Sequence, residues 1–292
     1  MDFNSYQTEA VKTQQVYKED DKINQVVPFL GLIGETGSVV AELKKRIRDG
    51  ENYSGFEKQL EEELGDVLWY ISNLASNYKL SLDGIAEKNL KKIRDRWVED
   101  DTSQYSILDE NYPPEEQFPR EFEVSFIEYN EGGKTKLKIE IEGKQIGDPI
   151  TDNSHEDDGY RYHDIFHFGY VAFLGWSPVV RKLLKIKRKS EANIDEVEDG
   201  ARAAIIEELV SLFVYSHAQN HQLFKYSDRV DSEILRDIQR LVSKIEVKDI
   251  TTRQWETAII ESYKVLHELQ KNQGGRVLVS IKNRKLLYIG KK

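Results

Sequence analysis

Two stretches of sequence decide the fold of the N-terminal third of this chain: Gly34-Glu35-Thr36-Gly37-Ser38-Val39-Val40-Ala41-Glu42-Leu43-Lys44-Lys45 and Glu61-Glu62-Glu63-Leu64-Gly65-Asp66-Val67-Leu68-Trp69-Tyr70. Residues three or four apart share one face of a helix, so Glu35, Ser38 and Glu42 form one stripe. Glu63 and Asp66 form a second stripe on the following segment. Apolar residues flank both stripes, and carboxylates this near a core need a counter-charge. Oxygen ligands from two helices therefore predict a site for Mg²⁺, or for Mn²⁺.

The composition of the whole chain indicates a globular protein of about two domains. Its 292 residues, of which 39% are hydrophobic, are enough for two separate cores. The absence of cysteine excludes disulfides, thiolate zinc sites and cysteine nucleophiles. A net charge of −10 argues against nucleic acid as a partner, because phosphate contacts need a basic face. No stretch reaches the roughly 20 apolar residues of a membrane span and no secretory signal is apparent, so we expect a cytoplasmic protein without a membrane partner.

The first 98 residues show helical periodicity throughout. Apolar residues recur at three- and four-residue spacing over residues 6–18, 28–48, 56–78 and 81–97. Breaks fall at Asp49-Gly50 and around Gly84. Four such helices predict a four-helix bundle as the first domain.

The remainder of the chain indicates a linker, a helical domain and two β-hairpins. Three of the six prolines lie between Pro113 and Pro119, which predicts a linker, and residues 99–159 also hold a hairpin signal. Helical periodicity returns over 160–270, and a second hairpin is expected within 271–292. Because an isolated hairpin is marginally stable in water, the two hairpins either share a sheet or each cover a helical face. The predicted fold class is therefore mainly α, with a four-helix bundle, a second helical domain and small β-hairpins.

The second helical domain contains an echo of the first. Residues 207–215 can be laid over 62–70, matching both acids, the leucine and the terminal tyrosine, with Ser211 at the position of Asp66. Amphipathic helices with paired glutamates also match by chance. Two interpretations stay open: a divergent duplication, whose degenerate copy could form an intramolecular pseudo-dimer with the first domain, and a coincidence.

Four motifs occur together in the first 98 residues: Asp2-Phe3-Asn4-Ser5-Tyr6-Gln7, Gly31-Leu32-Ile33-Gly34-Glu35-Thr36-Gly37, Glu63-x-x-Asp66, and Glu87-Lys88-Asn89-Leu90-Lys91-Lys92-Ile93-Arg94-Asp95-Arg96. In concert they resemble the MazG-like all-α nucleoside triphosphate pyrophosphohydrolases, whose hallmark is Glu-Glu-x-x-Glu on one helix and Glu-x-x-Asp on the next. The resemblance implies an Mg²⁺-dependent enzyme that hydrolyses a nucleoside triphosphate to the monophosphate and pyrophosphate. It also implies a helical bundle that commonly dimerises, so we expect a homo-oligomer.

The resemblance implies roles for single residues. Glu35, Glu63 and Asp66 match metal-binding carboxylates. Asn89 and Lys92 match positions near the substrate phosphates.

Two positions depart from the hallmark. Gly34 replaces its first glutamate, and Ser38 replaces its last, which normally binds metal. A hydroxyl holds an ion weakly or through water, and Glu42, one turn later, is a substitute ligand for this subsite. The predicted metal-binding set is Glu35 and Ser38 with the two acids of the second motif.

The chemistry expected from the residues agrees with the resemblance. Cleaving a phosphoanhydride requires neutralisation of the polyphosphate and an oriented water, and a free glutamate can take the proton. Glu62 or Glu42 is the predicted base, and Lys45 is a further predicted substrate-binding residue. The alternative is that these acids are surface residues with partners one turn away. We favour the site, because Gly37 and Gly65 weaken both helices at the same turns, as suits close approach of a helix or ligand.

The second half has candidates of its own. Asp164 and His167, or His163 and His167, share a helical face, a spacing that can bind metal. Acidic residues follow on a downstream helix, and the candidates for a second site are Asp164, His167, Glu198, Glu207 and Glu208. The alternative is a pair of histidines hydrogen-bonded within an aromatic core. The sequence His163-Asp164 is a weak match to HD-type metal phosphohydrolases, because their other ligands are not evident.

Three other features favour ordinary structural roles. The segment 181–190 carries six basic residues in nine positions; it could clamp a triphosphate or an oligonucleotide, but a solvated face paired with the following acidic run is commoner. His217 and His221 are expected on a helix surface. The aromatic residues between Tyr160 and Trp176 are expected in the core.

The sequence therefore predicts a nucleoside triphosphate pyrophosphohydrolase, acting on NTP or dNTP. One alternative is a nucleotide-sensing regulatory protein with a degenerate site, favoured by Ser38 and Ser211. A second alternative is a phosphohydrolase that works through the Asp164/His167 cluster.

Overall fold

The computed structural model describes residues 1–14, 21–97 and 107–291, and it divides into two compact units, Met1–Arg94 and Asp95–Lys292. The division falls inside helix α4 (Leu82–Trp97). The boundary expected at residue 98 lies outside the described residues. Helices dominate the described chain, so the mainly α fold class is confirmed.

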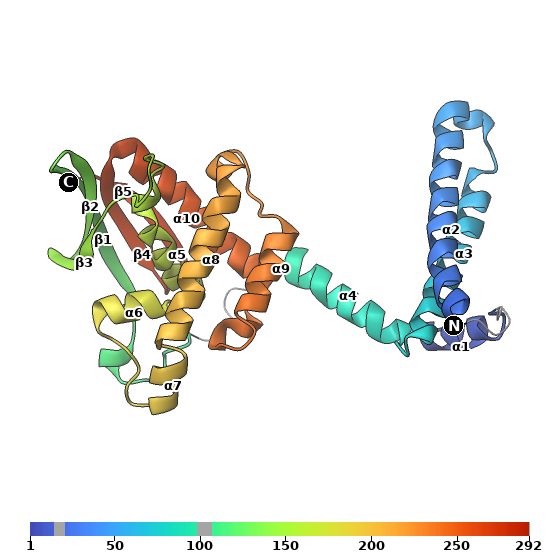
Figure 1. The fold of residues 1–292 in the computed structure, drawn as a ribbon, viewed down its shortest axis with the longest axis horizontal. Coiled ribbons are helices and arrows are strands. Elements are labelled where there is room, and N and C mark those ends of the chain that lie inside the picture. The colour runs from blue at the N-terminus through green and yellow to red at the C-terminus, as the bar shows by residue number, and fades with distance from the viewer. Residues whose placement is uncertain (15–20, 98–106, 292) are drawn as a thin grey trace. The chain divides into compact units, whose positions relative to one another are not determined.

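The first unit is built on two long helices, α2 (Asp21–Asp49) and α3 (Phe56–Asn77), which lie side by side (Figure 1). The 3₁₀ turn η1 (Gly50–Asn52) joins them. Helix α1 (Phe3–Val11) packs on α3, and Trp69 Nε1 donates a hydrogen bond to Thr13 Oγ1 (2.8 Å) just beyond the end of α1. The helix predicted over 6–18 therefore begins earlier and ends at Val11, with residues 15–18 outside the described chain.

A glycine allows α2 and α3 to approach closely. A Cβ atom at Gly31 would lie 2.1 Å from the ring of Tyr70, so only glycine permits this contact. Gly37 and Gly65 were predicted to allow close approach of a partner helix or a ligand. Within one chain a Cβ at either position would meet no atom within 4 Å among the described residues, so approach of a ligand or a second copy there stays a prediction.

The first unit leaves much of its apolar surface in solvent. Its buried side chains are few, whereas α2 alone exposes Ile33 (70%) and Ile47 (75%) together with Leu30, Val40 and Leu43. Helix α3 exposes Leu64 in the same way. Exposed apolar patches of this kind are common at protein–protein, membrane or ligand contacts. A four-helix core is thus not completed by the described residues of this unit in one chain.

One helical stretch, Lys22–Asn52, is long and apolar enough to cross a membrane, judged by length and composition only. This differs from the expectation that no segment would qualify. The stretch contains Glu35 and Glu42, and charged side chains at mid-bilayer depth are costly. Its large apolar residues Leu30, Ile33, Val40, Leu43 and Ile47 are exposed in this unit.

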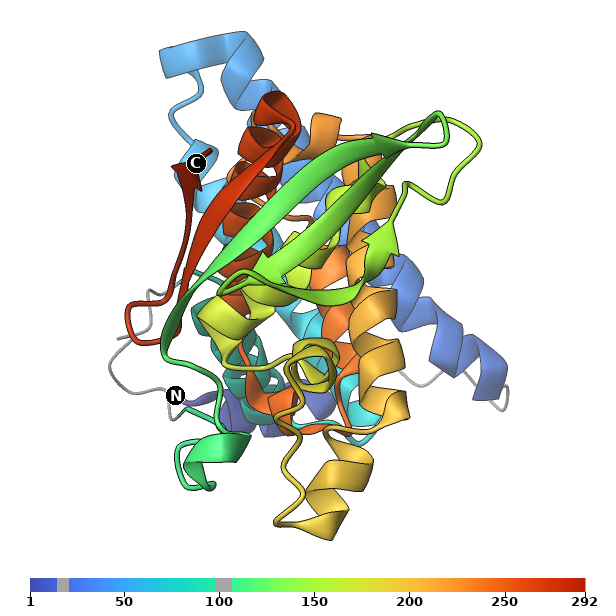
Figure 2. The ribbon, with the colours of Figure 1, turned by 90° about the vertical axis from the view of Figure 1, so that its left-hand side faces the viewer.

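The second unit contains one five-stranded antiparallel sheet with the strand order β3-β2-β1-β4-β5. Its strands are β1 (Glu121–Glu131), β2 (Lys134–Ile141), β3 (Lys144–Ile150), β4 (Gly274–Ser280) and β5 (Lys285–Gly290). Figure 2 shows the red C-terminal strands beside the green β1. The two predicted hairpins therefore share one sheet, and neither covers a helical face by itself. Strand β3 extends this sheet. The segments 99–159, 160–270 and 271–292, separated in the sequence analysis, instead form one compact unit over their described residues.

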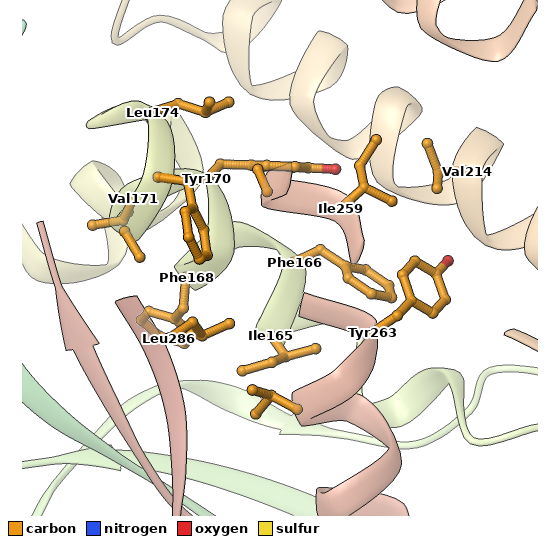
Figure 3. Packing of buried hydrophobic residues seen from close by; sticks show 14 of the residues in the cluster. Ile165, Phe166, Phe168, Tyr170, Val171, Leu174, Val214, Ile259, Tyr263 and Leu286 are labelled. Atoms are coloured by element: carbon orange, nitrogen blue, oxygen red, sulfur yellow. The ribbon is translucent and has the colours of Figure 1, made fainter. Parts of the chain in front are cut away.

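Helices cover the sheet and complete the core. Helices α5 (Asp164–Leu174) and α10 (Thr252–Asn272) pack together and against β4 and β5. Around them lie α6 (Pro178–Leu184), α7 (Ala192–Val197), α8 (Ala201–Gln219) and α9 (Ser232–Leu241). In Figure 3, Phe166 of α5 faces Tyr263 of α10, with ring centroids 4.8 Å apart, and Phe168 lies beside Leu286 of β5. The prediction that the aromatic run belongs to the core is confirmed.

The proline-rich segment is fixed rather than loose. Asp109 is fully buried, and its carboxylate accepts hydrogen bonds from the backbone N–H of Phe118 (2.7 Å) and from Arg181 Nη2 (2.9 Å). Arg120 Nη1 adds a third bond at 2.6 Å. These bonds attach the segment to the second unit, because a buried carboxylate is stable only when paired.

Candidate functional site

Three carboxylates converge between α2 and α3. Oxygens of Glu35 on α2 and of Glu63 and Asp66 on α3 all lie within 4.8 Å of one another. Glu35 and Glu63 are half-buried and Asp66 is exposed, so the group is reachable from solvent. Three negative charges this close repel one another unless a cation lies between them, and hard oxygen donors are those that Mg²⁺ and Mn²⁺ prefer. The donor set therefore fits a divalent cation of this class.

Residues of α1, α2 and α3 surround the three carboxylates. Glu35 lies one turn after Gly31, where α2 and the Tyr70 ring make close contact. Burial, with a smaller contribution from the charge of Asp66, raises the pKa of the Tyr6 hydroxyl on α1. Ser38 follows Glu35 by three residues and is half-buried on the same face of α2.

Glu42 has partners of its own. Its side chain is only 4% exposed, and its carboxylate accepts short hydrogen bonds from Lys45 Nζ and from the hydroxyl of Tyr53, which follows η1. The bond from Lys45, followed by that from Tyr53, lowers the pKa of Glu42. Lys45 is half-exposed, with its ammonium on Glu42. Tyr53 is a residue that the sequence analysis missed, because no spacing rule connects it to Glu42.

The other predicted residues of this site are on exposed surface. Glu62 is exposed on α3 and accepts one long bond, 3.4 Å, from Gln59 Nε2. Asn89 and Lys92 are exposed on α4. Among the described residues, no hydrogen bond or ion pair joins either of them to the three carboxylates.

A small cavity opens along the same helix pair. Its volume is about 190 Å³, and it is lined by Thr13, Gln14, Asn24, Val27, Pro28, Trp69, Tyr70 and Asn73. Trp69 follows Asp66 by three residues, so the cavity begins one turn from the carboxylates. Asn73 is buried, and within the described chain its Oδ1 has no hydrogen-bond partner. The sequence contained no periodic signal for this cavity.

A second group of metal-type donors lies in the second unit, on α5 and α8. Donor atoms of His163, His167 and Glu208 lie within 4.8 Å of one another. Asp164 Oδ1 is 3.7 Å from His163 Nε2 and 3.9 Å from His167 Nε2. Burial alone would lower the pKa of His167, but Glu207 and Glu208 raise it well above its ordinary value. The acidic surroundings of His167 therefore favour a positive charge at this position, carried either by the protonated ring or by a bound cation.

Not every predicted member of the second site reaches this group. Glu207 Oε1 is hydrogen-bonded to His167 Nδ1 (2.7 Å), on the opposite side of the imidazole ring from Nε2. Glu198 lies at the end of α7. Its carboxylate accepts a hydrogen bond from the backbone N–H of Glu246 (2.9 Å) and does not join the histidines.

The basic segment is partly buried, while Lys182, Lys185 and Lys189 are exposed. Arg188 is 1% exposed and forms ion pairs with Asp199 (2.6 Å) and Glu246 (2.7 Å), while Lys187 pairs with Asp195 (2.6 Å). Both sequence interpretations were wrong for Arg188, although the partners Asp195 and Asp199 do belong to the acidic run. Its guanidinium is a buried structural cation.

His217 lies in the last turn of α8, and His221 follows its end. Donor atoms of these histidines and of Asp231 lie within 4.8 Å of one another, and His217 Nε2 is 3.2 Å from Asp231 Oδ2. His221 and Asp231 are exposed and His217 is half-buried, and His221 lies beyond the helix on whose surface it was expected.

Residues 28–98 match the family model of the MazG nucleotide pyrophosphohydrolase domain, and residues 103–292 match that of the MazG C-terminal domain. Over 69 residues the chain is 36% identical to the "Gene 37 protein" of Mycobacterium phage L5; the match covers 23% of this chain and 60% of that protein. No solved structure matches the chain. With one family model on the carboxylate-bearing helices and the other on nearly the whole second unit, the chain belongs to the MazG family.

Proposed function

We propose that the protein is a Mg²⁺-dependent nucleoside triphosphate pyrophosphohydrolase of the cytoplasm, which hydrolyses an NTP or dNTP to the monophosphate and pyrophosphate. The observation that carries the proposal is the convergence of Glu35, Glu63 and Asp66 within 4.8 Å. The match of residues 28–98 to the pyrophosphohydrolase domain supports it. Mn²⁺ fits the same oxygen donors.

The three carboxylates would hold the cation, with Ser38 contributing at most through water. When bound, the cation neutralises charge on the triphosphate and increases the acidity of a coordinated water. Glu62 is the better proton acceptor of the two predicted bases, because its carboxylate makes only one long hydrogen bond. Glu42, whose pKa is lowered, is a weak base and instead holds Lys45 and Tyr53 in place.

We propose that the substrate lies along α2 and α3, with its base in the cavity beside Trp69 and its phosphates toward the carboxylates. The aromatic walls suit a planar ring. Asn73 Oδ1 is positioned to accept a hydrogen bond from a base N–H, which would satisfy a buried acceptor. Lys45, Asn89 and Lys92 are the proposed phosphate ligands, with Lys45 leaving Glu42 when substrate binds.

We also propose a homo-oligomer formed through the first unit. Ile33, Ile47 and their neighbours form an apolar face that a monomer would leave in water. A second copy of α2 and α3 would complete a four-helix core, since pairs of antiparallel helices bury such faces against each other.

The test is a product assay with Mg²⁺ across NTPs and dNTPs that separates pyrophosphate from orthophosphate. Glu63→Gln and Asp66→Asn should each abolish most pyrophosphate release, because they remove metal-binding charge at nearly constant shape. Glu61→Gln, an equally conservative change on an exposed acid of α3, is the matched control and should keep activity.

Three results would contradict the proposal. Orthophosphate as the product would indicate a different bond cleaved. Nucleotide binding without turnover in the unmodified protein would indicate the regulatory alternative. Unchanged turnover in both Glu63→Gln and Asp66→Asn would place the chemistry at other residues.

A further inference from the structure

We propose that the second unit contains its own site for a divalent transition-metal ion of the Zn²⁺ class, bound by His163, His167, Asp164 and Glu208. The site shares no residue with the carboxylate group of α2 and α3, and it stands independently of the proposed hydrolysis. It rests on the hydrogen bonds, the spacing and the burial of these four side chains.

The hydrogen bonds fix which nitrogen of each histidine faces the site. His163 Nδ1 lies 2.9 Å from the backbone carbonyl oxygen of Tyr160, which can only accept a hydrogen bond. His167 Nδ1 lies 2.7 Å from the Glu207 carboxylate, which also accepts. In its neutral form each ring therefore carries its proton on Nδ1 and presents a lone pair on Nε2, the form in which a histidine binds a metal ion.

The two lone pairs face carboxylate oxygens rather than donors. His167 Nε2 is 3.5 Å from Glu208 Oε2 and 3.9 Å from Asp164 Oδ1, and His163 Nε2 is 3.7 Å from the same Asp164 oxygen. These separations are too long for hydrogen bonds. Two ligands each about 2.0–2.2 Å from a tetrahedral ion lie roughly 3.3–3.6 Å apart. The His167–Glu208 pair matches this spacing, and the two pairs to Asp164 are slightly longer, at 3.7 and 3.9 Å.

His167 supplies an observation independent of the acidic cluster. Its side chain is fully buried, and its Nε2 has no hydrogen-bond partner among the described residues. A buried, unpaired polar atom is costly, and native proteins rarely keep one without a ligand. An ion between His167 and Glu208 would satisfy it.

The residues behind the site hold the ligands in place. Glu207 accepts hydrogen bonds from Ser177 Oγ (2.6 Å) and the backbone N–H of Val179 (2.9 Å) as well as from His167. A histidine oriented by a carboxylate, which is itself held by other groups, is the usual support of a metal-bound imidazole. The Tyr160 ring stacks on His163 at 4.5 Å and restricts its rotation.

The donor set selects the class of metal. Two imidazole nitrogens with carboxylate oxygens suit Zn²⁺, Co²⁺, Fe²⁺ or Mn²⁺ and differ from the all-oxygen set that suits Mg²⁺. The Glu208 side chain is 48% exposed, so the ion would be reachable from solvent and would keep room for a water ligand.

The test measures Zn²⁺ and Co²⁺ binding to the full chain in a Glu63→Gln/Asp66→Asn background, which weakens the N-terminal carboxylate group. We expect one Zn²⁺ per chain and a Co²⁺ visible spectrum with imidazole ligation. His163→Gln/His167→Gln should lose both signals. His217→Gln/His221→Gln is the matched control. It removes the two histidines of the other cluster, which are also four residues apart, and should retain both the Zn²⁺ stoichiometry and the Co²⁺ spectrum.

Because a change at the buried His167 could prevent folding, the exposed ligand is tested separately. Glu208→Gln should weaken Zn²⁺ binding at least tenfold while the metal-free protein melts as before. Glu207→Gln should weaken it by roughly 10–100-fold, as expected for a residue that orients a ligand. Excess Zn²⁺ should raise the Tm of the background protein more than that of Glu208→Gln.

Two outcomes would overturn the proposal. Loss of Zn²⁺ only in His217→Gln/His221→Gln would assign the ion to the surface cluster at Asp231. No stoichiometric Zn²⁺ or Co²⁺ binding in the background protein would mean that His167 is a protonated imidazolium paired with Glu207 and Glu208.

Discussion

At the scale of single residues, neighbouring acids on the same two helices differ in what surrounds them. Glu63 and Asp66 face Glu35 and form no ion pair with a basic side chain among the described residues, whereas Glu42, two turns along α2, is satisfied by Lys45 and Tyr53. A carboxylate with partners stabilises the fold, and one without partners is available to a cation. Substitution of Glu42 is therefore expected to change stability, and substitution near Glu35, Glu63 and Asp66 to change metal binding.

Ser38→Glu should strengthen metal binding. The substitution adds a carboxylate one turn from Glu35 on the face of α2 that carries the three acids. We expect a lower half-saturating Mg²⁺ concentration for pyrophosphate release. The control is Thr36→Glu, which adds the same charge to an exposed position on another face of α2.

An equal shift in Ser38→Glu and Thr36→Glu would indicate a general charge effect. No shift in Ser38→Glu would mean that another group already fills this subsite.

Glu42→Gln should destabilise the first unit in a pH-dependent way. Because folding lowers the pKa of Glu42, its ionised form stabilises the fold above the ordinary value of 4.5, and this contribution is lost as pH falls through the folded pKa. The Tm difference between the two proteins should be present at pH 7 and narrow below pH 4.5. Thermal unfolding followed by circular dichroism at several pH values measures it. A Tm difference that does not depend on pH would show that the charge of Glu42 does not contribute to the stability of the first unit.

At the scale of elements, the close contacts between helices have a specific residue requirement. A Cβ at Gly169 of α5 would lie 1.8 Å from Ser262 Oγ of α10. Gly169→Ala should therefore cost about 1–3 kcal/mol in unfolding free energy by overpacking, although alanine favours a helix. Denaturant unfolding measures it.

The matched control for this contact is Ser262→Ala in the Gly169→Ala protein. It removes the hydroxyl that the new Cβ would meet and should recover part of the loss, although Ser262 Cβ remains 3.1 Å away. Additive destabilisation by the two substitutions would mean that they do not interact.

The apolar face of α2 predicts the oligomeric state. Val40→Glu/Ile47→Glu should shift the protein toward monomer in sedimentation analysis, because charges would replace side chains that a second copy buries. Leu287→Glu, at an exposed leucine of β5, is the control and should not change the mass. A monomeric unmodified protein would contradict the proposed assembly.

The sequence predicted the local elements better than their assembly. The turn between β1 and β2 could be predicted because Gly132-Gly133 separates two alternating segments, and in the structure both glycines adopt positive φ. Strand β3 was missed because its sequence, with Gly147 and Pro149, has low strand propensity, and its pairing with β2 supplies what the sequence lacks.

For the candidate sites, too, the residues of one helix could be grouped from the sequence, but their tertiary partners could not. Glu35, Glu63 and Asp66 could be grouped from helical spacing and the resemblance, because each stripe is local. The burial of Arg188 could not be predicted, since Asp199 and Glu246 reach it only through tertiary structure and its neighbours in sequence are basic. Patterns within one helix are readable from sequence, whereas partners brought together by the fold are not.

At the scale of the whole molecule, the two units should differ in their effect on hydrolysis. Glu63→Gln should remove pyrophosphate release, whereas Asp164→Asn/His167→Gln should leave most of it, because the first unit carries the proposed reaction. Steady-state assays with Mg²⁺ as the sole added metal compare the two variants. The reverse pattern would assign the chemistry to α5 and α8.

The strand order of the sheet has a consequence for how the protein is made. Strand β1 pairs with β4, so that Phe126 lies opposite Gly275, and the chain between them supplies most of the second unit's helices. The pairing of β1 with β4 cannot form until residues 274–280 have been synthesised and have left the ribosome. Until then the faces of α5 that pack on α10, β4 and β5 are not yet fully covered, and exposed apolar segments of this kind are prone to aggregate.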